Sequence, residues 1–327
     1  MQLVLDTSKL EVQKKGNAFY LKSEKGNRTI SPEKLTSIAI TANVILHAGA
    51  IKLAIQHHIP ILFFDRIGKA KARMWSPYFA SIATLRRQQV KFTESADGTD
   101  WMINLFHFKS KAQIQNLEFL KTQGILTHRL LNQSIKAIRT HSKSFEEFRP
   151  HPPASCRNNI MGVEGSIARM YWQGVGNALP KQYSFQKRSR RPAQDIFNAA
   201  INYGYGMLYS VVEGSLFAVG LDPHLGILHA DEYAKPTLAF DLIEPFRPWV
   251  DRIIIEEIFL KKMKTEYFTS NQFGIFLNKH GKAWLIPRFN EWLHQPRKFL
   301  NREATTKNHI HHLAGLLAKR IRVDIPS

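Results

Sequence analysis

The chain has 327 residues, and its 46 Lys and Arg against 26 Asp and Glu give a formal net charge of +20. This excess favours a polyanionic partner, most often nucleic acid, although a protein can also be basic without binding one. The single cysteine, Cys156, excludes an intramolecular disulfide and a zinc site built from several cysteines. The first residues lack the apolar core of a signal peptide, and no apolar run approaches about 18 residues, so we expect a cytoplasmic protein that spans no membrane.

The beginning of the chain favours β-structure. Short apolar runs such as QLVLDT and AFYLKS are separated by the turn sequences KKGN and EKGN. One helix is expected in HAGAIKLAIQHHI. We therefore predict a small β-sandwich-like domain over residues 1–80 and a linker over residues 81–92. Helical spacing of apolar residues then predicts a larger all-α domain over residues 93–327, and an α+β protein overall.

Residues 158–175 contain an acid on an apolar stripe. Ile160, Val163 and Ile167 recur at helical spacing, and Glu164 falls within their stripe. A carboxylate that points inward is costly unless it is paired or binds a metal ion. The alternative is an edge position with a salt bridge to an arginine. Gly174 continues the stripe without a side chain, and we expect the helix to end near it.

Residues 195–220 form a second helical segment with two faces. One face is apolar, and the other carries Asn198, Asn202, Tyr205 and Tyr209, spaced four, three and four residues apart. These neutral hydrogen-bonding groups suit either the support of a neighbouring site or contact with a phosphate backbone. A polar seam between helices is the alternative. Gly220 is expected to end this helix.

The basic run KQYSFQKRSRR, residues 181–191, lies between these two helical segments. It supplies five basic residues and shows no helical stripe. We interpret it as a loop that grips phosphates, whereas a merely solvated charge run is the usual alternative. The candidate DNA-binding residues of this run are Lys187, Arg188, Arg190 and Arg191, to which the helical Asn202 is added.

Acidic residues collect in the segment LDPHLGILHADEYAKPTLAFDLIEPFRPWVD, residues 221–251. PTLAFDLIE predicts a helix capped by Thr237, and Asp241 and Glu244 are three residues apart, so they share a face. Two such carboxylates repel each other unless a cation lies between them. With Glu164 and a histidine they would suit Mg²⁺ or Mn²⁺. Spacing does not separate His229 from His224, and an acid-rich helix start beside an ordinary histidine is the alternative.

Four blocks of the sequence resemble the CRISPR-associated integrase and endonuclease family, the first-numbered Cas protein of spacer acquisition. They are GVEGSIARMYW, DIFNAAINYGYGMLYS, LDPHLGILH and TLAFDLIEPFRPWVD. The resemblance implies that Glu164, His229 (not His224) and Glu244 ligate the metal ion. It also implies that Asp241 is a further ligand, an orienting group or a proton acceptor. The family often has Asp where this chain has Glu244.

The resemblance further implies a homodimer formed through the N-terminal domains, with the second-numbered adaptation protein as partner. The expected reaction is a metal-dependent transesterification, in which a 3′-hydroxyl of a captured double-stranded DNA fragment attacks a CRISPR repeat. Arg247 matches the arginine that follows the acidic pair and joins the candidate DNA-binding residues. A general structure-selective nuclease on branched DNA and a non-catalytic nucleic-acid scaffold remain the alternatives.

Overall fold

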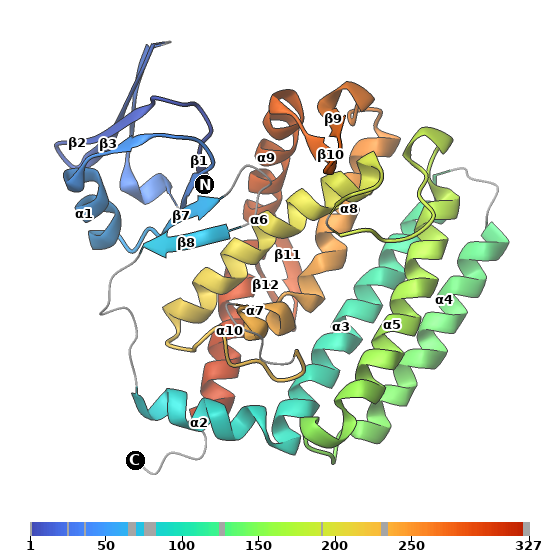
Figure 1. Ribbon diagram of the computed structural model, residues 1–327. Coiled ribbons are helices and arrows are strands. Elements are labelled where there is room, and N and C mark those ends of the chain that lie inside the picture. Colours follow the sequence, from blue (N-terminus) through green and yellow to red (C-terminus); the bar gives the residue numbers. More distant parts are fainter. Residues whose placement is uncertain are drawn as a thin grey trace. The chain divides into compact units, whose positions relative to one another are not determined.

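The computed structural model describes residues 2–24, 26–35, 37–64, 70–74, 83–123, 128–190, 192–229 and 235–322. The chain divides into two compact units, Met1–Ser81 and Ile82–Ser327 (Figure 1). Strands dominate the N-terminal unit, and long helices dominate the second, which we call the helical unit. The mixed α+β class predicted from the sequence is therefore confirmed.

The described residues of the N-terminal unit form two four-stranded sheets. The first has the order β1-β5-β7-β8, in which β1, β5 and β7 are parallel and β8 is antiparallel to β7. The second has the order β4-β3-β2-β6. Side chains from both sheets and from α1, among them Leu5, Val12, Phe19 and Leu53, form one apolar core. The elements are β1 (Gln2–Leu5), β2 (Glu11–Lys15), β3 (Ala18–Ser23), β4 (Gly26–Ile30), β5 (Ser37–Ile40), β6 (Ile45–Leu46), α1 (Ala48–Gln56), β7 (Ile61–Phe64) and β8 (Ala70–Met74), with a short 3-10 turn η1 (Pro32–Lys34).

The tight turns predicted in this unit are present. Gly16 lies between β2 and β3 with φ of 60°, and Gly26 opens β4 with φ of 125°. Residues with a side chain rarely adopt these angles, which explains glycine at both positions.

The helical unit consists mainly of nine helices in the part of the chain that the structure describes. The helices α3, α4 and α5 lie side by side (Figure 1). The α-helices are α2 (Ala83–Thr93), α3 (Ala96–Lys121), α4 (His128–Lys143), α5 (Pro153–Ala178), α6 (Ile196–Ala218), α7 (Thr237–Leu242), α8 (Arg247–Phe259), α9 (Lys279–His294) and α10 (Thr306–Arg322). The 3-10 turns are η2 (Ser144–Phe148), η3 (Lys181–Tyr183), η4 (Glu244–Phe246) and η5 (Thr265–Tyr267).

The sequence predicted that this unit is all-α, and that prediction is wrong. Two antiparallel hairpins pair β9 (Phe268–Asn271) with β10 (Gly274–Leu277), and β11 (Pro296–Phe299) with β12 (Arg302–Thr305). Leu300 and Asn301 join the second pair with φ of 51° and 57°. Two consecutive positive angles are the geometry of a type I′ turn, for which Asn-Gly or Asp-Gly is the usual sequence. Because Leu300–Asn301 lacks these turn residues, the hairpin could not be predicted from the sequence.

The predicted linker is largely a helix. Residues 83–92 lie in α2, where Leu85 and Phe92 are buried in the core of the helical unit. The Gln89 side chain donates to the Asp222 carbonyl at 2.7 Å and accepts from the Asp222 amide at 2.9 Å. This reciprocal pair holds α2 against the segment that follows α6.

The helices α5 and α3 approach each other closely at Gly174. A Cβ on Gly174 would lie 2.9 Å from Leu117 of α3. Gly174 therefore permits helix contact and does not end α5, which continues to Ala178. Gly220, in contrast, has φ of 88° just beyond α6, as predicted for a helix end.

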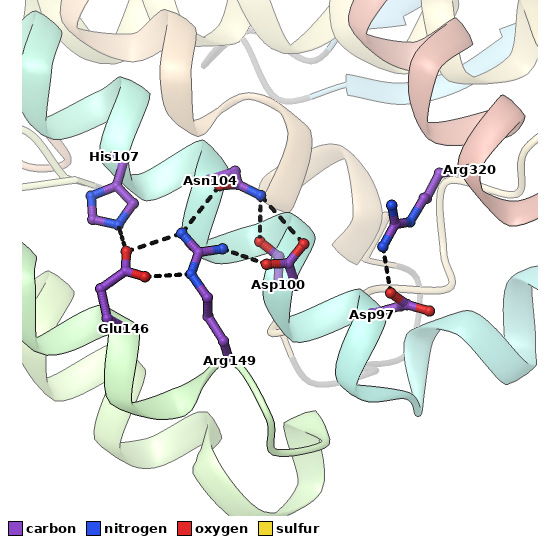
Figure 2. A network of polar contacts seen from close by, with 7 residues as sticks. All are labelled: Asp97, Asp100, Asn104, His107, Glu146, Arg149 and Arg320. Atoms are coloured by element: carbon purple, nitrogen blue, oxygen red, sulfur yellow. Dashed lines mark hydrogen bonds and ion pairs between the residues drawn. The ribbon is translucent and has the colours of Figure 1, made fainter.

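An exposed polar network joins α3 to η2 (Figure 2). His107 contacts Glu146 at 2.6 Å, and Arg149 pairs with both Glu146 and Asp100. The hydrogen bond from Arg149 lowers the pKa of Glu146 to about 2. All of these polar groups have partners, so the network fastens the turn after α4 to α3.

No helix in the described ranges is long and apolar enough to cross a bilayer.

Candidate functional site

Three charged side chains from three separate elements, two of them buried and one partly buried, meet in the helical unit. Glu164 of α5 accepts a hydrogen bond from the Lys109 ammonium of α3. The same ammonium lies 2.6 Å from Oε2 of Glu244, the first residue of η4. The side chains of Lys109, Glu164 and Glu244 are 8%, 20% and 3% exposed. The structure therefore brings together the two glutamates selected from the sequence, with a lysine between them.

Arg247 completes this cluster. Its guanidinium lies 3.0 Å from Oε1 of Glu244. Burial alone would raise the pKa of Glu244, but the positive charges of Arg247 and Lys109 outweigh it and lower that pKa to about 2. The glutamate is therefore a buried carboxylate that stays ionised at neutral pH.

His229 and Asp241 form a second, adjoining part of the site. The His229 ring Nδ1 lies 2.7 Å from Asp241 Oδ1. The backbone amides of Ile227, Leu228 and His229 also donate to the Asp241 carboxylate, at 2.6, 3.2 and 3.2 Å. Asp241 is 1% exposed, and these four donors use both of its oxygens. It holds the loop before α7 and fixes the orientation of the imidazole.

The choice between the two histidines follows from their neighbours. The His224 side chain is 54% exposed and faces Asp222 at 3.3 Å. His229 is held by the buried Asp241, and its positive form contributes to the low pKa of Glu244. Of the two histidines, His229 is thus the one with a buried acidic partner, and its role as a metal ligand stays a prediction.

The turn that presents His229 depends on close backbone packing. A Cβ on Gly226 would lie 2.6 Å from the His229 carbonyl oxygen and 2.7 Å from Thr237. The prediction that Thr237 caps the following helix is wrong: Pro236 is the cap residue, and the Thr237 hydroxyl donates to the His224 carbonyl at 2.6 Å. Thr237 thereby closes the turn against the start of α7.

The donor groups suit a hard divalent cation. Two carboxylates and an imidazole are the ligand types expected for Mg²⁺ or Mn²⁺. Glu244 Oε2 is buried and has no well-aligned hydrogen-bond donor among the described residues, although the Lys109 ammonium is close. Within the same residues, no three His, Cys, Asp or Glu side chains are grouped as a ready metal site. Lys109 lies where two carboxylates could share a metal ion.

Lys109 was missed at the sequence level, although a signal for it exists. Met102, Phe106, Gln113 and Asn116 mark the buried side of α3, and Lys109 falls on the same side at helical spacing. A lysine on a buried stripe needs a buried partner. The same reasoning identified Glu164, and applied to both helices it would have paired them.

A further acid, Asp251, is buried elsewhere in the helical unit. Asp251 of α8 accepts hydrogen bonds from the hydroxyls of Tyr171 and Tyr205 at 3.0 and 2.7 Å. Burial raises the pKa of Asp251 to about 7, against the effect of both hydrogen bonds. The Tyr205 ring also contacts the guanidinium groups of Arg188 and Arg247, 5.4 and 5.3 Å from its centroid. Tyr205 thus connects Asp251 to the arginine beside the buried glutamate.

The basic run contains two kinds of residue. Lys187 and Arg190 are exposed. Arg188 instead donates to the side-chain oxygens of Asn198 and Asn202 at 2.6 and 2.7 Å. The Asn202 amide nitrogen in turn donates to the Ser189 carbonyl at 3.2 Å. Arg188 and Asn202, both selected as DNA-binding residues, therefore hold the loop to α6.

The two remaining DNA-binding candidates are Arg247 and Arg191. The Arg247 guanidinium is engaged with Glu244 and the Tyr205 ring, and its side chain is 20% exposed. Arg191 lies outside the described residues.

The fold is shared with solved structures of known description. A structure described as a casposase bound to an integration product matches with a TM-score of 0.81 and 23% identity, over 100% of this chain and 92% of that one. A Cas6-RT-Cas1–Cas2 complex matches with a TM-score of 0.76 and 22% identity, over 98% of this chain and 35% of that one. The chain thus shares its fold with a casposase and with about a third of a chain in that complex.

Sequence similarity then gives the family. The family model described as CRISPR associated protein Cas1 matches residues 3–291, and this chain belongs to the Cas1 family. A CRISPR-associated endonuclease Cas1 of Archaeoglobus fulgidus is 25% identical over 303 residues, 88% of this chain and 86% of that protein. The family resemblance drawn from the four sequence blocks is confirmed.

Proposed function

We propose that this chain is a metal-dependent DNA endonuclease and integrase of CRISPR adaptation. It would join the 3′-hydroxyl ends of a captured DNA fragment to a CRISPR repeat by transesterification. Support comes from the family, from a relative named as an endonuclease and from a fold neighbour bound to an integration product. The observation that carries the proposal is the close pair of the partly buried Glu164 and the buried Glu244 in a chain of net charge +20.

Glu164, Glu244 and His229 would hold the cation in this proposal. When bound, Mg²⁺ or Mn²⁺ would polarise the scissile phosphate and stabilise the charge that develops on it. Asp241 accepts from His229 Nδ1, so the lone pair of the neutral ring lies on Nε2, the nitrogen left for ligation. A carboxylate that fixes a ligating histidine in this way is a recurring feature of metal sites. Asp241 therefore acts as the orienting group, since four donors already use its oxygens.

Other basic residues would position the DNA. Lys187 and Arg190 are exposed on the loop that Arg188 and Asn202 anchor, so they can reach phosphates while the anchor keeps the loop in place. Arg247 remains beside Glu244 and balances the charge of the cluster. We therefore assign DNA binding to the exposed Lys187 and Arg190, and loop anchoring to Arg188 and Asn202.

The proposed assembly is a homodimer formed through the N-terminal units and associated with Cas2. The match to a complex that contains both Cas1 and Cas2 supports this partner. The other proposed partner is double-stranded DNA, both as the captured fragment and as the CRISPR repeat.

A strand-transfer assay tests the proposal. A labelled fragment with 3′-hydroxyl ends and a supercoiled plasmid carrying a repeat are incubated with Mn²⁺ and with EDTA. The wild-type chain should join the label to the plasmid in the presence of Mn²⁺ but not in EDTA. Glu164→Ala and His229→Ala should abolish joining, and both variants should still bind DNA. Glu147→Ala removes an exposed glutamate and is the matched control.

Three results would count against specific parts of this proposal. Cleavage of branched DNA without joining would favour a structure-selective nuclease. Joining that persists in EDTA or in Glu164→Ala would refute the metal-dependent site. DNA binding that disappears from a folded Glu164→Ala chain would refute the assigned division between binding and chemistry.

A further inference from the structure

The Lys109 ammonium occupies the space between the two glutamates that the proposed function assigns to a metal ion. It donates to Glu164 and lies 2.6 Å from Glu244 Oε2. Its side chain is 8% exposed, so water can do little to replace these two carboxylates as partners. A lysine buried in this way remains charged only because the carboxylates are there.

The charges of the cluster balance without any metal ion. Glu164 and Glu244 contribute two negative charges, and Lys109 and Arg247 contribute two positive ones. A divalent cation added to this buried cluster would leave two unbalanced positive charges close together, which is unfavourable. Loading with metal is therefore favoured if one of the resident cations leaves.

Lys109 is the cation that can leave. Arg247 is held both by Glu244 and by the Tyr205 ring at 5.3 Å. The ammonium of Lys109 also lies 5.8 Å from the centroid of the Phe106 ring, but it is carried on a flexible four-carbon stem, and its charged contacts are the two carboxylates that the ion would take. Movement of a single side chain would thus open the position between the glutamates.

We propose that Lys109 is a built-in counter-cation, which holds Glu164 and Glu244 together in the metal-free chain and which a divalent ion must displace in order to bind. This inference rests on the proposed metal site. It assigns to Lys109 the role of keeping the two carboxylates close in the absence of metal, at the expense of metal affinity.

Calorimetric titration with Mn²⁺ tests the proposal on the purified full chain. Lys109→Met should bind Mn²⁺ at least about tenfold more tightly than wild type, because a positive charge next to the ligands is gone. Its melting temperature without metal should fall, since the carboxylates repel each other, and should rise on addition of Mn²⁺. Lys111→Met removes an exposed lysine from the same helix and should bind Mn²⁺ as wild type does.

A second measurement uses chains that keep the charge, should Lys109→Met fail to fold. In spectra of ¹⁵Nζ-labelled lysine, the buried ammonium should give a slowly exchanging signal that Lys109→Arg lacks. Addition of Mg²⁺ should abolish this signal in wild type.

The outcomes separate this inference from the proposed function. Mn²⁺ binding to Lys109→Met that is no tighter than to wild type, or a ¹⁵Nζ signal that persists at saturating Mg²⁺, overturns the role of Lys109 alone. Failure of both wild type and Lys109→Met to bind Mn²⁺ overturns the metal site itself.

Discussion

Asp241→Asn is the substitution for which the structure gives the largest consequence for the smallest change in shape. The carboxylate is 1% exposed and accepts from three backbone amides and from the His229 ring. An asparagine has one acceptor oxygen, and its amide nitrogen would face N–H groups that need an acceptor. Whichever way the amide is turned, two of the four donors, at least one of them a backbone amide, lose the acceptor that Asp241 provides.

The magnitude follows from those two donors. A hydrogen bond to a charged group contributes about 1.5–3 kcal/mol, so the free energy of unfolding should fall by at least about 3 kcal/mol. For a folding unit of this size, that loss lowers the melting temperature by at least about 6 °C. Because His229 also loses the group that orients it, we expect Mn²⁺ affinity to fall by about 10–100-fold.

Thermal unfolding and Mn²⁺ titration of the same samples provide the assay. Asp97→Asn is the matched control, because it makes the same chemical change at a side chain that is 57% exposed and paired with Arg320. Exposed pairs contribute between 0 and about 1 kcal/mol, so this control should melt close to wild type. If Asp241→Asn melts no lower than Asp97→Asn, the four hydrogen bonds do not stabilise the turn and the reasoning is refuted.

Three other predictions concern packing, the basic loop and pH. A Cβ on Gly204 would lie 2.7 Å from α8, so Gly204→Ala should cost about 1–3 kcal/mol in urea unfolding, whereas Gly162→Ala meets open space and should not destabilise. Arg188→Ala should lower both stability and DNA affinity, and Lys187→Ala should lower DNA affinity alone in a filter-binding assay; equal melting of both would contradict the anchor role. Burial raises the pKa of Asp251 from 3.8 to about 7, so folding takes up a proton in that window and stability falls as pH rises through it. Relative to Asp251→Asn, wild type should lose up to about 1.4 kcal/mol per pH unit there, and parallel stability curves would exclude this titration.

The parts of the site that lie close together in sequence could be predicted from it. Glu164 stood out because it interrupts an apolar stripe, and Gly220 was predicted to end its helix, as it does. Asp241 and His229 are 12 residues apart in sequence and meet directly, although spacing alone did not separate His229 from His224. Local spacing carries this information because a helix or turn fixes which neighbours share a face.

The parts that depend on tertiary packing could not be predicted in this way. The Lys109 partner lies on another helix, and α3 alone does not reveal which carboxylate it will meet. Arg188 looked like a phosphate ligand because it lies in a basic run without a helical stripe, but two asparagines of α6 bind it. The hairpin at Leu300 and Asn301 lacked its usual turn residues, so only the packed structure reveals it.

The contacts that assemble the site join distant segments of the chain. Lys109 and Glu164 are 55 residues apart, and Tyr171 and Asp251 are 80 residues apart. Contacts across such separations form only after long loops have closed, at a cost in chain entropy that comes before the gain. A nascent or truncated polypeptide can therefore form single helices without forming the carboxylate cluster. The proposed DNA-cutting centre is thus a late product of folding, and partly synthesised chains lack it.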